Sequence, residues 1–132
     1  MTCVDLFAGS GALGLEAASR GAARVTLVDK NPRIVAALLD SKRMLGAGQV
    51  NVVNADALEF LAQDRSVFDL VFVDPPFAEG PPVAIMSALT GRLAVGAMVY
   101  YEGGQLFEAP SGWRKLKQGR AGIVHFHLLQ VV

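Results

Sequence analysis

The chain has 132 residues, which is enough for one globular domain and too few for two ordinary ones. Hydrophobic residues make up 52% of the chain and charged residues only 18%, and this composition excludes intrinsic disorder. Twelve Lys and Arg side chains match twelve Asp and Glu side chains, and this neutrality alone argues against a protein that binds nucleic acid through its overall charge. The charges are unevenly distributed, however, because residues 111–132 contain no acid and four bases: Arg114, Lys115, Lys117 and Arg120.

No stretch of the sequence approaches the roughly 18 apolar residues of a membrane span, and the chain does not open with the pattern of a signal peptide. The single cysteine, Cys3, lies in an apolar run, where a buried side chain is a better interpretation than a catalytic thiol. We therefore expect a soluble, cytoplasmic protein without disulfides.

Short apolar runs alternate with helical patterns along the chain. Strands are predicted at residues 3–8, 24–29, 50–54, 68–74 and 98–102, and helices at residues 12–20, 32–45, 57–63 and 82–93. Nearly continuous apolar strands that alternate with helices are typical of a parallel sheet covered on both faces. Residues 113–117 and 123–131 predict an antiparallel hairpin around residues 118–122. We expect one α/β domain over residues 1–132, a Rossmann-like doubly wound sheet with an antiparallel C-terminal hairpin.

Residues at the ends of helices support these assignments. Asn31 precedes Pro32 as a typical N-cap, and Gly46 follows the same predicted helix as a stop signal. Gly21 is a plausible C-terminal cap for the helix before it. The segment that begins at Asp56 has the form of a capping box.

The carboxyl ends of the predicted strands carry the residues of functional interest, because ligands of open α/β sheets bind there. The first strand runs into the sequence DLFAGSGALG at residues 5–14, whose glycines permit a tight turn and a close approach of backbone N–H groups to a ligand. Asp29 ends the second strand, where a carboxylate can accept both hydrogen bonds of a ribose diol. This pattern also fits a dinucleotide site, so an NAD-dependent oxidoreductase is an alternative, although no Tyr/Lys or His pair suits hydride transfer.

The third and fourth strands also end in polar residues. Asp56 follows the third strand, although an N-cap role is a sufficient reason for Asp at that position. Residues 74–77 read Asp-Pro-Pro-Phe, and two prolines after a buried strand stiffen a loop that presents Asp74 and Phe77. A loop that merely ends a strand seldom needs all four residues, so this motif favours a binding site.

Together, residues 5–14, Asp29, residues 54–57 and residues 74–77 resemble a class I S-adenosylmethionine-dependent methyltransferase of the amino-group type. The longer strings DLFAGSGALGLEA and VFVDPPF are similar to those of the bacterial 16S ribosomal RNA guanine-N2 methyltransferases (the RsmD family). The similarity covers nearly the whole chain, including the basic hairpin. It implies S-adenosylmethionine as cofactor, no metal, and 16S rRNA of the small ribosomal subunit or its assembly intermediate as partner.

The resemblance also implies roles for individual residues. The cofactor-binding residues would be Asp5 near the methionine ammonium group, Asp29 at the ribose and Asp56 with Ala57 at the adenine, with the turn of Phe7, Gly9, Ser10 and Gly11 around the methionine portion. Asp74 and the Pro75 carbonyl would accept hydrogen bonds from the target amine, and Phe77 would stack on the flipped-out base.

Other residues have competing interpretations. His125 and His127 lie two apart on the last predicted strand, where a polar strand face is a better interpretation than a metal site. Trp113 suits a core or sheet edge at least as well as stacking on RNA. The basic hairpin is either a solvated edge or a set of phosphate contacts, and the RNA substrate of the family favours the second.

Two departures from the family pattern are visible. Family members carry an Arg-rich N-terminal segment before the first strand that this chain lacks, and their loop after the Asp-Pro-Pro-Phe motif is often basic, whereas residues 78–80 here read Ala-Glu-Gly. The alternatives are therefore a DNA adenine-N6 or protein glutamine-N5 methyltransferase, which have related loops, or a non-catalytic RNA-binding fragment. We expect a monomer.

Overall fold

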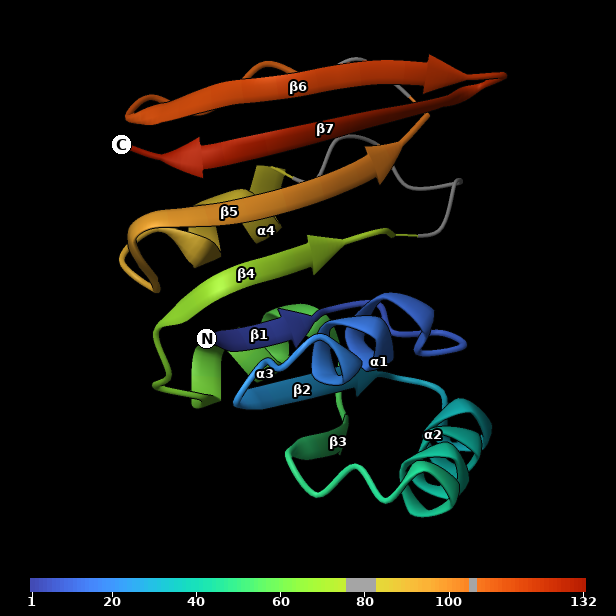
Figure 1. Ribbon diagram of the computed structural model, residues 1–132. Coiled ribbons are helices and arrows are strands. Elements are labelled where there is room, and N and C mark those ends of the chain that lie inside the picture. The colour runs from blue at the N-terminus through green and yellow to red at the C-terminus, as the bar shows by residue number, and fades with distance from the viewer. Residues whose placement is uncertain (76–82, 105–106) are drawn as a thin grey trace.

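The computed structural model describes residues 1–75, 83–104 and 107–132 (Figure 1). Its strands form one seven-stranded sheet in the order β3-β2-β1-β4-β5-β7-β6. The strands are β1 (Thr2–Asp5), β2 (Arg24–Asp29), β3 (Val50–Asn54), β4 (Phe68–Val73), β5 (Leu93–Gly103), β6 (Trp113–Ala121) and β7 (Val124–Val131). Strands β1 to β5 pair in parallel, whereas β7 pairs antiparallel with both β5 and β6. The predicted sheet with its antiparallel hairpin is confirmed.

Four helices connect the parallel strands: α1 (Ala12–Ser19), α2 (Pro32–Leu45), α3 (Ala57–Gln63) and α4 (Val83–Leu89), within the described part of the chain. The predicted caps of α1 and α2 are present. The Asn31 side chain accepts a hydrogen bond from the Arg33 N–H at 2.9 Å, and Gly46 ends α2 in the left-handed conformation. Gly21 follows α1 with a φ of 98°. None of these helices is long and apolar enough to span a membrane.

The helices cover the sheet in two layers. Helices α3 and α4 bury one face together with residues of β1, β4 and β5, among them Val4, Val71 and Val99. Helices α1 and α2 bury the other face over β1, β2 and β3, around Cys3, Val25 and Val50. The two layers lie on opposite sides of the sheet, as Figure 1 shows for α1 in front of it and α4 behind it. The predicted burial of Cys3 is confirmed.

The layer of α1 and α2 extends only as far as β4 in the described part of the chain. Leu70 and Phe72 of β4 pack against this layer, whereas Tyr100 and Leu128 beyond it are half-exposed. Side chains alternate along β5, so Ala97, Val99 and Tyr101 are buried on the side of α4 while Tyr100 and Glu102 project to the opposite side. This alternation decides which side chains of β5 lie beside the end of β4.

Several predicted boundaries are wrong. Strand β1 ends at Asp5 rather than at residue 8, because the glycine turn begins there, and β5 begins at Leu93 rather than at residue 98. The turn of the hairpin lies at residues 122–123 rather than 118–122. Gly122 has a φ of 62°, whereas Gly119 stays within β6, opposite Phe126, whose ring occupies the space of a Cβ atom. The glycine that marks a turn and the glycine that marks close packing look alike in sequence.

The interpretation of His127 as part of a polar strand face is also wrong, because the residue is fully buried in the core. Its Nε2 accepts a hydrogen bond from the Phe107 N–H at 3.1 Å, and its ring stacks on Tyr101 with 5.2 Å between the centroids. Burial lowers the pKa of this imidazole, so the neutral form is favoured. His127 is therefore a core residue that satisfies a backbone donor. Trp113 packs at the edge of the same core.

The close packing of α1 on the sheet gives a first prediction. A Cβ atom at Gly14 would collide with the Leu27 side chain, so Gly14→Ala should lower the free energy of unfolding by about 1–3 kcal/mol in urea titrations. Gly48→Ala is the matched control, because a Cβ atom there meets nothing within 4 Å and Gly48 has no positive φ. Equal unfolding midpoints for the two variants would contradict this account of Gly14.

Candidate active site

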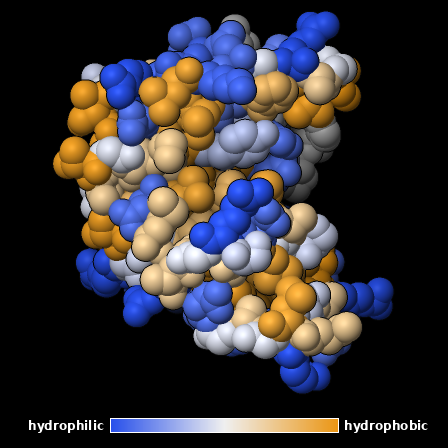
Figure 2. Space-filling model, in the orientation of Figure 1, coloured by the Kyte–Doolittle hydropathy of each residue, from blue (hydrophilic) through white to orange (hydrophobic). Residues whose placement is uncertain are grey.

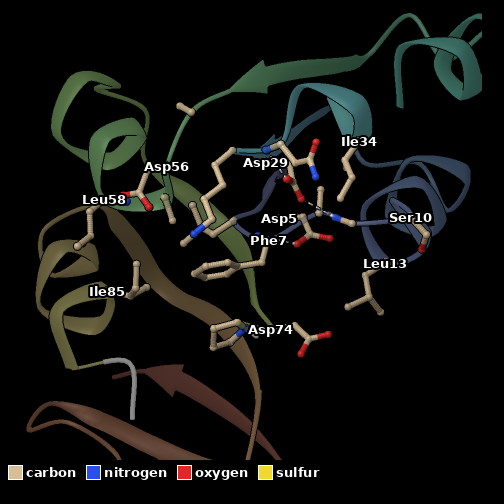
Figure 3. A pocket seen from close by; sticks show the side chains of 18 of the residues that line it. Asp5, Phe7, Ser10, Leu13, Asp29, Ile34, Asp56, Leu58, Asp74 and Ile85 are labelled. Carbon is tan, nitrogen blue, oxygen red and sulfur yellow. Dashed lines mark hydrogen bonds between the residues drawn. The ribbon is translucent and has the colours of Figure 1, made fainter. Parts of the chain in front are cut away.

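A cavity of about 840 Å³ lies where the chain leaves the carboxyl ends of β1, β2, β3 and β4 (Figure 3). Strand order reverses between β1 and β4, which is the switch point at which doubly wound sheets bind ligands. Nine of the predicted site residues line this single cavity: Asp5, Phe7, Gly9, Ser10, Asp29, Asp56, Ala57, Asp74 and Pro75. Gly11 does not line the cavity, and Phe77 lies outside the described residues.

The glycine turn after β1 is shaped by two left-handed residues, Gly9 with a φ of 55° and Gly11 with a φ of 81°. Gly11 is the N-cap of α1, so its contribution is to turn the chain into the helix. A Cβ atom at Gly11 would also lie 2.7 Å from the Leu38 side chain. Both the backbone conformation and the packing therefore require glycine at this position.

Asp29 ties the glycine turn to the start of α2. One carboxylate oxygen accepts a hydrogen bond from the Gly9 N–H at 3.1 Å, and the other accepts one from the Asn31 N–H at 2.9 Å. Asn31, and not Asp29, is the N-cap of α2. Asp29 therefore presents a fixed carboxylate at the edge of the cavity, as expected of a residue that accepts hydrogen bonds from a diol (Figure 3).

Asp5 is the most deeply buried acid of the cavity, with 2% of its surface exposed. One carboxylate oxygen accepts a hydrogen bond from the Phe7 N–H at 3.3 Å. The pKa of Asp5 is raised to about 7, chiefly by burial. The nearby carboxylates of Asp74 and Asp29 contribute to the rise, and hydrogen bonds from backbone N–H groups oppose it. A cationic ligand group beside Asp5 would favour its ionised form.

Asp56 is the N-cap of α3, because its side chain accepts a hydrogen bond from the Leu58 N–H at 3.1 Å. The reciprocal bond of a capping box, from the Asp56 N–H to Glu59, is not present among the described residues. The N-cap role does not remove Asp56 from the cavity, since Asp56, Ala57 and Leu58 all line it. Figure 3 shows Asp56 and Leu58 on the side of the cavity opposite Ser10 and Leu13.

Asp74 and Pro75 line the cavity directly after β4. Asp74 is exposed by surface area, yet partial desolvation by its neighbours raises its pKa, and the neighbouring Glu102 carboxylate raises it further. Glu102 and Tyr100, which the sequence motifs did not predict, lie next to Asp74 but are not among the described residues that line the cavity. The Tyr100 hydroxyl donates a hydrogen bond to Glu102 Oε1 at 2.7 Å. The signal was the alternation of Tyr100 and Glu102 along a strand that ends beside β4. It has meaning only once the pairing of β4 with β5 is known.

The acids of the cavity form no ion pair in the described part of the chain, although Lys30 also lines the cavity. The three ion pairs there join Arg20 to Glu16, Arg43 to Asp40 and Arg92 to Asp64, all outside the cavity. Among the described residues, no group of three or more His, Cys, Asp or Glu side chains is arranged to hold a metal ion.

The basic residues of the hairpin lie away from the cavity. Arg114, Lys117 and Arg120 are exposed, and Arg114 donates a hydrogen bond to Gln130 Oε1 at 2.6 Å. Hydrophilic residues gather at the top of the molecule in Figure 2, where Figure 1 places β6. This edge of the sheet presents positive charge to solvent.

Comparison with known proteins places this geometry in a family. A family model described as "Conserved hypothetical protein 95" matches residues 1–130. The chain is 41% identical over 133 residues to "Ribosomal RNA small subunit methyltransferase D" of Escherichia coli (strain K12), an alignment that covers 97% of this chain and 67% of that protein. It is 35% identical to the protein of the same name from Haemophilus influenzae, with 97% and 70% covered.

Solved structures agree with these relatives. A putative methyltransferase from Escherichia coli superimposes with a TM-score of 0.92 at 39% identity, covering 98% of this chain and 75% of that chain. A putative methylase from Haemophilus influenzae superimposes with a TM-score of 0.91 at 34% identity, covering 99% and 86%. The chain therefore belongs to the Conserved hypothetical protein 95 family, the RsmD family that its motifs resemble, and it is a methyltransferase with the class I fold.

Proposed function

We propose that this protein transfers a methyl group from S-adenosylmethionine to the exocyclic N2 amine of a guanine in 16S ribosomal RNA. The observation that supports the proposal is one cavity that joins the acids suited to the cofactor, Asp5, Asp29 and Asp56, to Asp74 and Pro75 of the Asp-Pro-Pro-Phe motif. Residues 1–132 would form one catalytic domain that acts as a monomer in the cytoplasm. The relatives named for the small ribosomal subunit support an RNA of that subunit, or of its assembly intermediate, as substrate.

The cavity fits S-adenosylmethionine, the cofactor of methyltransferases with this fold. Its volume of about 840 Å³ lies within the usual range for ligand sites. In this proposal Asp5 pairs with the ammonium group of the methionine portion, Asp29 accepts from the ribose hydroxyls, and Asp56 accepts from the adenine amine, with the Ala57 N–H facing the ring. Phe7, Ile34 and Leu58 supply apolar surface in the same cavity. S-adenosylmethionine supplies an electrophilic methyl group bound to a sulfonium.

The target amine requires help because the N2 lone pair of guanine is delocalised into the ring. Hydrogen bonds from its N–H groups to the Asp74 carboxylate and the Pro75 carbonyl orient the amine toward the methyl donor. Asp74 is also the group that accepts the released proton, directly or through water. Phe77 would stack on the flipped-out base, since chemistry on an exocyclic amine requires the base outside its stack.

Two other enzyme classes make different predictions. A DNA adenine-N6 or protein glutamine-N5 methyltransferase shares the Asp-Pro-Pro-aromatic loop, and methylation-naive small ribosomal subunits, DNA and protein offered with labelled cofactor separate the three. The 41% identity to a protein named for the ribosomal small subunit favours RNA. An NAD-dependent oxidoreductase would leave the Asp-Pro-Pro-Phe motif without a role, and calorimetric titration with S-adenosylhomocysteine and with NAD distinguishes it.

Asp74 provides a test of the reaction itself. Asp74→Ala removes the acceptor for the target amine, so we expect kcat/KM for methylation of naive small subunits to fall by about 10²–10⁴-fold. The affinity for S-adenosylhomocysteine should change little. Asp40→Ala, which removes a carboxylate that is 67% exposed and lies outside the cavity, is the control. Full methyl transfer by the Asp74 variant would refute the assignment.

Asp5 provides a test of the cofactor pose through pH. Because its pKa in the empty protein is raised to about 7, more of the carboxylate is ionised as the pH rises, and affinity for S-adenosylhomocysteine should increase between about pH 6 and pH 8. Asp5→Asn should weaken binding about tenfold or more and remove this pH dependence, as measured by calorimetry. Asp40→Asn is the control.

Asp5→Asn, which should weaken cofactor binding, should stabilise the empty protein. The native state binds more protons than the unfolded chain between the ordinary pKa of Asp and the raised value of about 7, so the empty protein loses stability as the pH rises through this window. Asp5→Asn should therefore raise the Tm of the empty protein at pH 8. A lower Tm together with unchanged affinity would contradict both expectations for Asp5.

The hairpin provides a test of RNA contact. Replacement of Arg114, Lys117 and Arg120 by Gln should reduce the slope of log affinity against log salt concentration by about two, because each phosphate contact contributes about 0.7 with single-stranded RNA. Arg20, Lys42 and Arg43, which lie on α1 and α2 or next to them, are the matched control for the loss of three charges. An equal slope for the hairpin variant and the wild-type protein would exclude these contacts.

A further inference from the structure

Glu102 lies next to Asp74 at the carboxyl edge of the sheet. Strands β4 and β5 pair in parallel, with Phe72 opposite Tyr100 and Val73 opposite Tyr101, so the next positions along the two strands are Asp74 and Glu102. Side chains two apart on a strand point to the same face. The rings of Phe72 and Tyr100 meet edge to face on that side, with 6.3 Å between their centroids. Asp74 and Glu102 therefore lie next to each other, directly beyond the contacting side chains of Phe72 and Tyr100.

Tyr100 fixes the orientation of the Glu102 carboxylate. Its hydroxyl donates a hydrogen bond to Glu102 Oε1 at 2.7 Å and has only that one proton to donate. Oε2 has no hydrogen-bond partner in the described part of the chain, and no ion pair there involves Glu102. The register of β4 and β5 puts Glu102 beside Asp74, and its negative charge adds to the desolvation that raises the pKa of Asp74. A carboxylate oriented by Tyr100, with one oxygen that has no partner among residues 1–75, 83–104 and 107–132, therefore lies beside the group assigned to the target amine.

Guanine has the hydrogen-bond donors that such a pair of carboxylates can bind. Its Watson–Crick edge presents the N2 amine next to the N1–H group, whereas adenine presents an amine next to N1 as an acceptor. An enzyme that acts on a flipped base reads this edge by hydrogen bonds. Asp74 with the proline carbonyl, which the proposed function assigns to the amine, cannot by itself distinguish the two purines, because both bases present an amine.

We propose that Glu102 selects guanine by accepting a hydrogen bond from N1–H while Asp74 accepts from the N2 amine. This inference rests on the proposed function and assigns its base specificity to a residue outside the sequence motifs. Adenine at the same place would oppose its N1 lone pair to a carboxylate, so it would lose the hydrogen bond that guanine makes and meet repulsion instead. Tyr100 is the positioning residue that holds Glu102 in place.

The test uses a substrate without the N1–H group. The guanine that the wild-type protein methylates is located by mass spectrometry, and 16S rRNA with guanine or 2-aminopurine at that position is assembled into small subunits. 2-Aminopurine keeps the amine but has an acceptor at N1, which a carboxylate repels and an amide N–H can bind. Glu102→Gln should therefore lower kcat/KM for guanine and reduce the preference for guanine over 2-aminopurine by about tenfold or more. Wild-type and variant proteins are each compared on both bases, so the effect of the missing O6 of 2-aminopurine on kcat/KM cancels.

Further variants separate specificity from damage to the fold. Glu108→Gln removes an exposed carboxylate after β5 and should leave the base preference unchanged. Tyr100→Phe should reduce the preference less than Glu102→Gln does, because the carboxylate remains. All variants should keep the wild-type affinity for S-adenosylhomocysteine and a similar Tm. Glu102→Gln removes a negative charge beside Asp74, so it should also move the acid limb of the kcat/KM profile to lower pH. Asp5 and Tyr100, whose pKa values Asp74 influences, are both retained in this variant.

The outcomes distinguish this inference from the proposed function. A wild-type protein that methylates no guanine of the small subunit overturns the proposed function and the role of Glu102 with it. A wild-type protein that methylates guanine, combined with an unchanged base preference in Glu102→Gln, overturns only the role of Glu102. Loss of activity on both bases to the same extent also overturns it, because a merely structural residue would produce that result.

Discussion

Four carboxylates at one edge of a parallel sheet set the requirements for the rest of this structure. Asp29 and Asp5 end β2 and β1, Asp74 follows β4, and Glu102 is the last residue but one of β5. These four strands are neighbours in that order. Parallel pairing brings these ends to the same edge, so charges that are far apart in the sequence repel one another in space. Desolvation and this repulsion raise the pKa of Asp5 and of Asp74. A cationic group or hydrogen-bond donors from a ligand relieve that repulsion.

The fold offsets part of the repulsion through backbone groups. Helices α1, α2 and α3 all begin at the edge of the cavity, where the positive ends of their dipoles and their free N–H groups favour negative charge. The Gly9 and Asn31 N–H groups bind Asp29, and the Phe7 N–H binds Asp5. Glycine at position 9 permits this arrangement, because its φ of 55° is in the left-handed region. The turn therefore stabilises the acids of the protein before any ligand binds.

The sequence predicted those parts of the site that depend on local spacing. The glycine turn, Asp29 and the Asp-Pro-Pro-Phe motif each carry their signal within a few residues of a strand end. All nine of the predicted residues that line the cavity end or follow one of the first four strands. Glu102 and His127 were not predicted correctly, because their environments depend on how β5 pairs with β4 and β7. In the sequence, a histidine at that position predicts a polar strand face. In the fold it can be a core residue because the Phe107 N–H donates a hydrogen bond to its Nε2.

The neutral net charge of the chain conceals two surfaces with different roles in the proposed reaction. The edge of the base that reacts carries hydrogen-bond donors, which suit a row of carboxylates, whereas the phosphates that flank it require positive charge. The exposed bases of β6 lie two strands away from β5 in the sheet and provide that charge at a separate edge. A nucleotide that is flipped out of its stack can satisfy both surfaces at once, since its donors leave the RNA while its phosphates remain outside the cavity. The neutral total thus combines an excess of four acids over residues 1–110, which include the acids of the cavity, with an excess of four bases over residues 111–132.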